Sequence, residues 1–179
     1  EDLEAWVEQL REASGPALSA NRTMGALGGV IASRIAREFR IGGPSFTISS
    51  EETSGLRALE VALGALRDGS LDTALVGAVD LAGDIRTVLA AGASRPYSPS
   101  GKARPFDAHA DGPVPGEGAC AIVLKRHADA VRDGDRIYAV ICGIGLASGG
   151  EAFGEGYARA LERAYAQSAI EPKSVTYLE

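Results

Sequence analysis

The amino-acid sequence predicts an α/β protein, and three features support that prediction. Continuous apolar runs of strand length occur at 73–79 and 118–124, which is typical of buried strands. Helical periodicity is clear around them, for example at 154–168. The expected order of elements, strand–helix–strand–helix–loop–strand–strand–helix–strand, is that of the α/β class. The 179 residues are enough for one domain with a sizeable core.

The first forty residues predict two helices. Apolar residues recur at helical spacing over 2–13, and Gly15-Pro16 ends that helix. Residues 21–25 predict a loop. A second helix at 29–39 presents small side chains on one face, so another helix can pack closely against it.

A strand, a sharp turn and the start of a helix are predicted next. Residues 46–48 form the strand, and Ser49 and Glu52 have the spacing of an N-terminal capping box. The helix that follows buries a stripe of leucines and ends at Gly69, which supplies a left-handed cap. With the first long apolar run, these elements predict a right-handed βαβ unit with parallel strands.

The remainder of the chain predicts elements around a long loop at 92–117, rich in Gly, Pro, Ser and Asp. A loop of this length in a compact domain is usually functional or buried in an interface. The expected elements are a short helix at 83–91, a buried strand at 118–124, a helical link at 125–131, a strand at 136–146, a helix at 154–168 and a last strand at 175–179.

Composition excludes several classes of partner. The net charge of −6 and the lack of a basic run argue against nucleic acid or an anionic membrane. No uncharged apolar run approaches the ~18 residues of a membrane span, and no signal peptide is visible. Cys120 and Cys142 lie in apolar runs, which predicts buried free thiols of a cytoplasmic protein. Neither Cys is beside a His or in a Cys-x-x-Cys pair, so we expect no metal site and no cofactor.

The adjacent carboxylates Glu51 and Glu52 are candidate site residues with two interpretations. They can complement the helix macrodipole and cap N–H groups, worth ~0.3–1 kcal/mol each. Alternatively, one is a site carboxylate whose pKa is raised by its neighbour. Adjacent helical residues point in different directions, so a carboxylate pair of the glycosidase kind is not expected.

Other reactive side chains give weaker patterns. His109 and His127 lack a partner pattern, which is more typical of surface residues than of catalysts. The glycine-rich stretch 143–150 misses the Gly-x-Gly-x-x-Gly spacing and has no Walker Lys. Three acidic residues of the long loop could bind a cation, although turn-stabilising hydrogen bonds are the better interpretation. These residues are Asp107, Asp111 and Glu117.

Several short motifs occur in the order and spacing of a known family. They are Gly43-Pro44-Ser45, Leu56-Arg57-Ala58-Leu59, Ala74-Leu75-Val76-Gly77-Ala78-Val79, Arg104-Pro105-Phe106-Asp107, Ala110-Asp111-Gly112, Gly116-Glu117-Gly118-Ala119 and Val123-Leu124-Lys125-Arg126. From about residue 25 onward the chain thus resembles a β-ketoacyl synthase of the thiolase superfamily. The resemblance implies a layered αβαβα fold, of which 1–179 would be an incomplete central part. Residues 1–126 would be the remainder of its N-terminal half and 127–179 the start of its C-terminal half.

The nucleophile position of that family is changed in this chain. Catalytic members carry Gly-Pro-Ser-x-x-Val-Asp-Thr-Ala-Cys-Ser-Ser, and Glu52 falls on the Cys. The resemblance therefore implies a chain-length factor, the non-elongating partner of an active ketosynthase. The turn is most similar to the chain-length-factor domain of bacterial polyunsaturated fatty acid synthases. Chain-length factors of aromatic polyketide synthases generally carry Gln at this position, so Glu52 departs from them.

The resemblance also implies a pocket and partners. The substrate pocket would include Ser50, Glu51, Thr53 and Phe106. The partners would be an active ketosynthase in a heterodimer, an acyl carrier protein, and acyl or malonyl thioesters of fatty acid or polyketide synthesis. Three alternatives stay open: a malonyl-carrier decarboxylase, an active synthase that uses a residue other than Cys, and a scaffold without a pocket. The start without Met and the strand-like end indicate a fragment of a larger protein.

Overall fold

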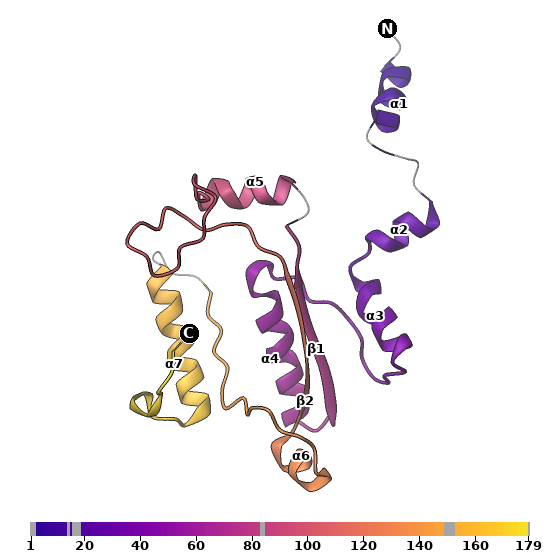
Figure 1. Ribbon diagram of the computed structural model, residues 1–179. Helices are drawn as coiled ribbons and strands as arrows, with labels where there is room; N and C mark the ends of the chain where they lie inside the picture. The colour runs from indigo at the N-terminus through magenta and orange to yellow at the C-terminus, as the bar shows by residue number, and fades with distance from the viewer. Residues whose placement is uncertain (1–2, 14, 16–18, 83–84, 149–152, 179) are drawn as a thin grey trace. The chain divides into compact units, whose positions relative to one another are not determined.

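The computed structural model describes residues 3–13, 15, 19–82, 85–148 and 153–178 (Figure 1). The chain divides into two compact units, Glu1–Ser49 and Ser50–Glu179. The first unit holds the three N-terminal helices, and the second holds the sheet. In the described ranges, no helix is long and apolar enough to cross a membrane.

Three helices make up the first unit: α1 (Leu3–Ala13), α2 (Ala20–Ala26) and α3 (Gly29–Glu38). The predictions of α1 and α3 are confirmed. The loop predicted at 21–25 is wrong, because α2 covers that segment. The side chain of Ser19 caps α2 by accepting a hydrogen bond from the backbone N–H of Arg22 at 3.3 Å. Such a cap stabilises a helix start even where apolar periodicity is weak.

The strand predicted at 46–48 is absent. These residues are outside every helix and strand of the described chain, and no strand pairs with them. Their apolar residues favour an extended chain, but a strand also needs a hydrogen-bonded neighbour, which local sequence does not specify.

An antiparallel pair of strands forms the sheet of the second unit, β1 (Thr73–Asp80) and β2 (Gly118–Lys125). The register pairs Thr73 with Lys125 and Asp80 with Gly118. The predicted βαβ unit, with parallel strands at 46–48 and 73–79, does not form in the described residues, because its first strand is absent. The apolar runs predicted both strands correctly, but not their direction or their neighbours.

Helix α4 (Ser54–Arg67) packs on one face of this sheet (Figure 1). The buried core between them consists of Ala62, Leu66, Ala74 and Val76. A Cβ added at Gly55 would lie 2.9 Å from the Cβ of Ala78, so the first turn of α4 approaches β1 very closely. The helix ends before Gly69, whose φ of +79° is the left-handed conformation predicted for it.

Strand β2 is more exposed than predicted. Because side chains alternate across a sheet, the face turned away from α4 carries Leu75 of β1 and its partner Val123 of β2. These side chains are 43% and 71% exposed. The predicted burial of β2 is wrong because α4 covers only one face of the pair.

The remaining elements surround the long loop: α5 (Ile85–Ser94), α6 (His127–Asp133), α7 (Phe153–Ser168) and the 3₁₀ turn η2 (Pro172–Ser174). Helix α5 confirms the helix predicted at 83–91, of which residues 83–84 lie outside the described chain. The predicted strands at 136–146 and 175–178 are wrong, since neither segment joins a ladder; Glu179 is not described. Instead, the backbone N–H of Ile144 donates to Oε1 of Gln167 in α7 at 2.7 Å.

Candidate functional site

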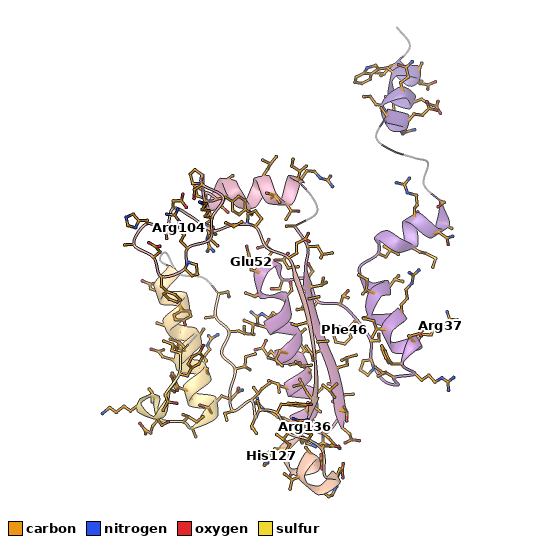
Figure 2. The ribbon with its side chains drawn as sticks, in the orientation of Figure 1. Arg37, Phe46, Glu52, Arg104, His127 and Arg136 are labelled. Carbon is orange, nitrogen blue, oxygen red and sulfur yellow. The ribbon has the colours of Figure 1, made fainter. Side chains whose placement is uncertain are left out.

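The turn before α4 contains the candidate site residues Glu51 and Glu52. It forms the 3₁₀ turn η1 (Glu51–Thr53), so α4 itself begins at Ser54. Glu51 has a φ of +49°, a left-handed conformation that is uncommon for a residue with a side chain. Figure 2 shows Glu52 at the N-terminal end of α4. The sequence predicted the turn, but gave no sign of the left-handed residue.

Hydroxyl groups, rather than carboxylates, stabilise this turn. The backbone N–H of Ser50 donates to Oγ of Ser54 at 2.8 Å, and this hydroxyl donates to the carbonyl of Glu51 at 2.6 Å. The hydroxyl of Thr53 donates to the carbonyl of Ser50 at 2.8 Å. The predicted capping box of Ser49 and Glu52 is therefore wrong, because η1 moves the helix start two residues beyond Glu52.

Both carboxylates of the turn are exposed. Neither Glu51 nor Glu52 forms an ion pair or a side-chain hydrogen bond within the described chain. Capping by their side chains thus has no support in the geometry. A favourable interaction with the positive end of α4 is still available to them.

Residues 95–117 form the long loop, with an ordered hydrogen-bond pattern. Oγ of Ser98 donates to Oδ1 of Asp111 at 2.5 Å, and the N–H of Ser100 donates to Oδ2 of Asp111 at 3.3 Å. These bonds, that of Ser98 first, lower the pKa of Asp111. The N–H of His109 donates to Oδ1 of Asp107 at 2.8 Å. Turn-stabilising roles are thus confirmed for Asp107 and Asp111, and the described residues contain no cluster that could hold a metal ion.

Phe106 lies in this loop, two residues after Arg104, which Figure 2 labels. Its side chain is fully exposed, and its φ is +63°. The structure brings Ser50, Glu51, Glu52 and Thr53 together in one turn. It shows no contact between that turn and Phe106 in the described part of the chain, so a shared pocket stays a prediction.

Both histidines are on the surface, as predicted. Nδ1 of His109 lies 3.2 Å from Oδ1 of Asp107, with 84% of the His side chain exposed. His127 is exposed at the start of α6, at the end of the unit far from Glu52 (Figure 2). Neither has the buried setting that tunes a catalytic imidazole.

The two cysteines are free thiols, but the prediction that they are buried is wrong. Cys120 is on the poorly covered strand β2. Cys142 is in the segment beside α7, at a hollow of about 280 Å³ lined by residues that include Leu161 and Tyr165. That hollow does not include the turn before α4.

A charged cluster that the sequence did not predict joins α4, β1, β2 and α6. Arg126 donates to the carbonyl of Leu66 at 3.0 Å and to that of Leu71 at 2.6 Å. It also pairs with the carboxylates of Asp72 and Asp129. Arg126 and Asp129 are three residues apart in the sequence, and this i,i+3 spacing could have predicted their ion pair, which is one part of the network. Its contacts are structural, since they satisfy backbone carbonyls where elements end.

Comparison with known proteins identifies the family to which the sheet, the helix after the sharp turn and the long loop belong. The family description "Beta-ketoacyl synthase, N-terminal domain" matches residues 4–130. The chain belongs to the β-ketoacyl synthase family. The predicted family is therefore confirmed.

Solved structures support the same fold. The chain is similar to the oxazolomycin ketosynthase domain OzmH KS7 of Streptomyces albus, with 29% identity and a TM-score of 0.78 over 97% of this chain and 31% of that one. It is also similar to the module 6 ketosynthase of the bacillaene synthase of Bacillus subtilis, with 31% identity and a TM-score of 0.77 over 91% and 31% of the two chains. The thiolase-like fold, present in part, is confirmed.

Curated relatives are large synthases. One polyunsaturated fatty acid synthase subunit of a Thraustochytrium species is 35% identical over 185 residues, which cover 100% of this chain and 6% of that protein. The hybrid PKS-NRPS synthetase TAS1 of Gloeophyllum trabeum is 40% identical over 157 residues, 83% of this chain and 10% of that protein. The chain thus spans a small share of the relatives it matches.

Proposed function

We propose that this chain is part of a chain-length factor of polyunsaturated fatty acid or polyketide biosynthesis. Such a protein does not elongate; it pairs with an active β-ketoacyl synthase and shapes the acyl pocket. One observation carries the proposal: Glu52 stands where the family motif that begins at Gly43 has the nucleophilic Cys. The similarity to part of a polyunsaturated fatty acid synthase supports the pathway.

The chemistry of a carboxylate argues against elongation by this chain. Elongation requires a nucleophile that accepts an acyl group from a thioester and holds it until condensation. Attack by the carboxylate of Glu52 would form a mixed anhydride, which water hydrolyses readily. The hydroxyls of Ser50, Thr53 and Ser54 are hydrogen-bonded within the turn, and none of these bonds in the described residues goes to a carboxylate or an imidazole that could act as general base. No neighbouring group therefore activates a substitute for the thiol.

The other parts of the proposal follow from the family frame. Ser50, Glu51, Thr53 and Phe106 would line the pocket, and acyl carrier protein would deliver acyl and malonyl thioesters. Residues 1–126 would belong to the N-terminal half of the domain and 127–179 to the C-terminal half, consistent with a match of the N-terminal description to 4–130.

Acyl transfer to the complete protein tests the proposal. The native protein and its Glu52→Cys and Glu52→Gln variants are each incubated with acyl-loaded carrier protein, and intact mass reports covalent acylation. We expect no adduct on the native protein or on Glu52→Gln. We expect an adduct on Glu52→Cys if the surrounding frame still binds the thioester.

An adduct on a residue of the native turn would overturn the proposal in favour of an active synthase. Release of carbon dioxide from malonyl carrier by the native protein without its partner would indicate a decarboxylase. Unchanged product length in a Phe106→Ala complex would remove that residue from the proposed pocket.

A further inference from the structure

The hydroxyl of Ser54 makes two hydrogen bonds across the turn before α4. It accepts a bond from the backbone N–H of Ser50 at 2.8 Å and donates one to the carbonyl of Glu51 at 2.6 Å. The backbone N–H of Ser54 donates to the same carbonyl. These bonds join the first residue of α4 to the two residues that precede Glu52. They lie within one short turn, so they form without any other part of the domain.

Glu51 is the residue that these bonds hold in an unfavourable conformation. Its φ of +49° lies in the left-handed region, where the Cβ of an L-residue crowds the following carbonyl oxygen. Such a conformation persists only where the surrounding contacts determine it. The Ser54 hydroxyl bonds the chain on both sides of this strain, at the N–H of Ser50 and at the carbonyl of Glu51 itself.

The hydroxyl of Thr53 has a more replaceable role in the same turn. It donates to the carbonyl of Ser50 at 2.8 Å, but that carbonyl also accepts the backbone N–H of Thr53 at 3.0 Å. The half-buried N–H of Ser50, by contrast, donates only to the Ser54 hydroxyl in the residues that the structure describes. Because a donor left without a partner is costly, loss of the Ser54 hydroxyl should disturb the turn more than loss of the Thr53 hydroxyl.

We propose that Ser54 is a positioning residue of this turn: its hydroxyl holds Glu51 left-handed and so fixes the direction in which residue 52 presents its side chain. Ser54 acts through Glu51 rather than through contact with a substrate, because a change of φ at one residue redirects the residue that follows it. The inference rests on the proposed function in taking position 52 as the reacting position of the family motif. It does not depend on whether the native Glu52 is inert.

A thiol at position 52 reports on the turn in the complete protein. Iodoacetamide labelling of Glu52→Cys is followed against pH by mass spectrometry of the peptide that carries this position. The thiol should have a pKa below the ~8.5 of a free Cys, since the N-terminal end of α4 favours the thiolate. Adding Ser54→Ala should raise this pKa and slow labelling at neutral pH by about three- to tenfold. Adding Ser54→Thr, which keeps the hydroxyl, or Thr53→Val, the matched control, should leave both nearly unchanged.

Glycine at position 51 separates positioning from a general loss of structure. Gly adopts a positive φ without strain, so Glu51→Gly should restore fast labelling to the variant that carries Glu52→Cys and Ser54→Ala. Glu51→Ala removes the same charge but keeps a Cβ, so it should restore labelling much less.

Four results would overturn the proposal: an ordinary thiol pKa in Glu52→Cys, no effect of Ser54→Ala, an equal effect of Thr53→Val, or equal restoration by Glu51→Gly and Glu51→Ala. The last result would mean that charge, rather than conformation, controls the thiol. Acylation of the native turn would overturn the proposed function and leave the labelling results unchanged, so the two failures are distinguishable.

Discussion

At the level of single residues, the carboxylate of Glu52 is separate from the bonds that hold its turn together. Hydroxyls of Ser50, Thr53 and Ser54 make those bonds. Replacing Glu52 should therefore change the chemistry of the turn with little effect on its conformation. This separation makes the Glu52→Cys and Glu52→Gln variants informative about acylation rather than about folding.

Gly112 is the residue at which we expect backbone strain to matter most in the long loop. Its φ is +145°, and an added Cβ would lie 2.6 Å from the backbone N of Ser98. The clash involves backbone, which cannot move aside without breaking the Ser98–Asp111 hydrogen bonds. We predict that Gly112→Ala lowers the free energy of unfolding by about 1–3 kcal/mol.

Gly116→Ala is the matched control for that measurement, since an added Cβ there meets no atom within 4 Å. Chemical denaturation of the two variants should show a loss only for Gly112→Ala. Equal stability of both variants would contradict the ordered loop.

Asp133 forms ion pairs with Lys125 and Arg132, and its pKa provides a test of these pairs in solution. Hydrogen bonds from Arg132 first, and from Lys125, lower this pKa to about 2. Because the folded pKa is below the ordinary value near ~3.9, the ionised form is favoured by folding. This contribution to stability is present above pH ~4 and is lost as the pH falls toward about 2.

We predict that NMR titration of the carboxyl carbon gives a strongly lowered pKa for Asp133. The pKa should rise in both Arg132→Gln and Lys125→Met, and more in Arg132→Gln, since Arg132 is the larger cause. An ordinary pKa in the native chain would show that the ion pairs of Asp133 do not form in solution.

At the level of elements, the effect of replacing a glycine of α4 depends on whether that glycine lies against β1. A Cβ at Gly55 would lie 2.9 Å from the Cβ of Ala78, whereas a Cβ at Gly64 meets nothing within 4 Å. We predict that Gly55→Ala destabilises the chain by about 1–3 kcal/mol through overpacking. Gly64→Ala should stabilise it by up to about 1 kcal/mol, because Ala has the higher helix propensity.

The two substitutions are identical in chemistry and lie in the same helix, so each is the other's control. The midpoint of thermal denaturation should fall for Gly55→Ala and rise for Gly64→Ala. A shift in the same direction would mean that α4 does not approach β1 at its first turn. The Gly55 contact also bears on the candidate site, because it determines how closely the turn that carries Glu52 lies to the sheet.

At the level of the whole molecule, local signals in the sequence predicted most helices and both paired strands. The leucine stripe of α4 and the apolar run of β1 specify their elements by periodicity and composition alone. The predicted strands at 46–48 and 136–146 did not form because a strand also requires a neighbour. Helix α2 was missed because its start depends on one cap at Ser19.

The candidate site was predictable to a similar degree. Sequence reasoning identified the turn and its two carboxylates, and the motif order identified the family. It did not predict the left-handed Glu51 or the hydroxyl bonds, which depend on the exact start of α4. The Arg126 cluster escaped prediction because its acceptors Leu66 and Leu71 are remote in sequence.

The division into two compact units predicts that their stabilities can be changed separately. Leu66 of α4 is the most deeply buried core side chain that the structure describes, at 3% exposed, and it packs against β1 in the second unit. Leu66→Ala removes buried methyl groups and leaves a cavity, so we predict a loss of about 2–5 kcal/mol for that unit. Hydrogen exchange measured residue by residue should then accelerate in α4, β1 and β2, while exchange in α1 and α3 stays unchanged.

The exposed Leu56 of the same helix, at 50% exposure, offers the control, and Leu56→Ala should have a much smaller effect. Faster exchange in α3 after Leu66→Ala would show that the two units unfold together, and the chain would then behave as one cooperative body.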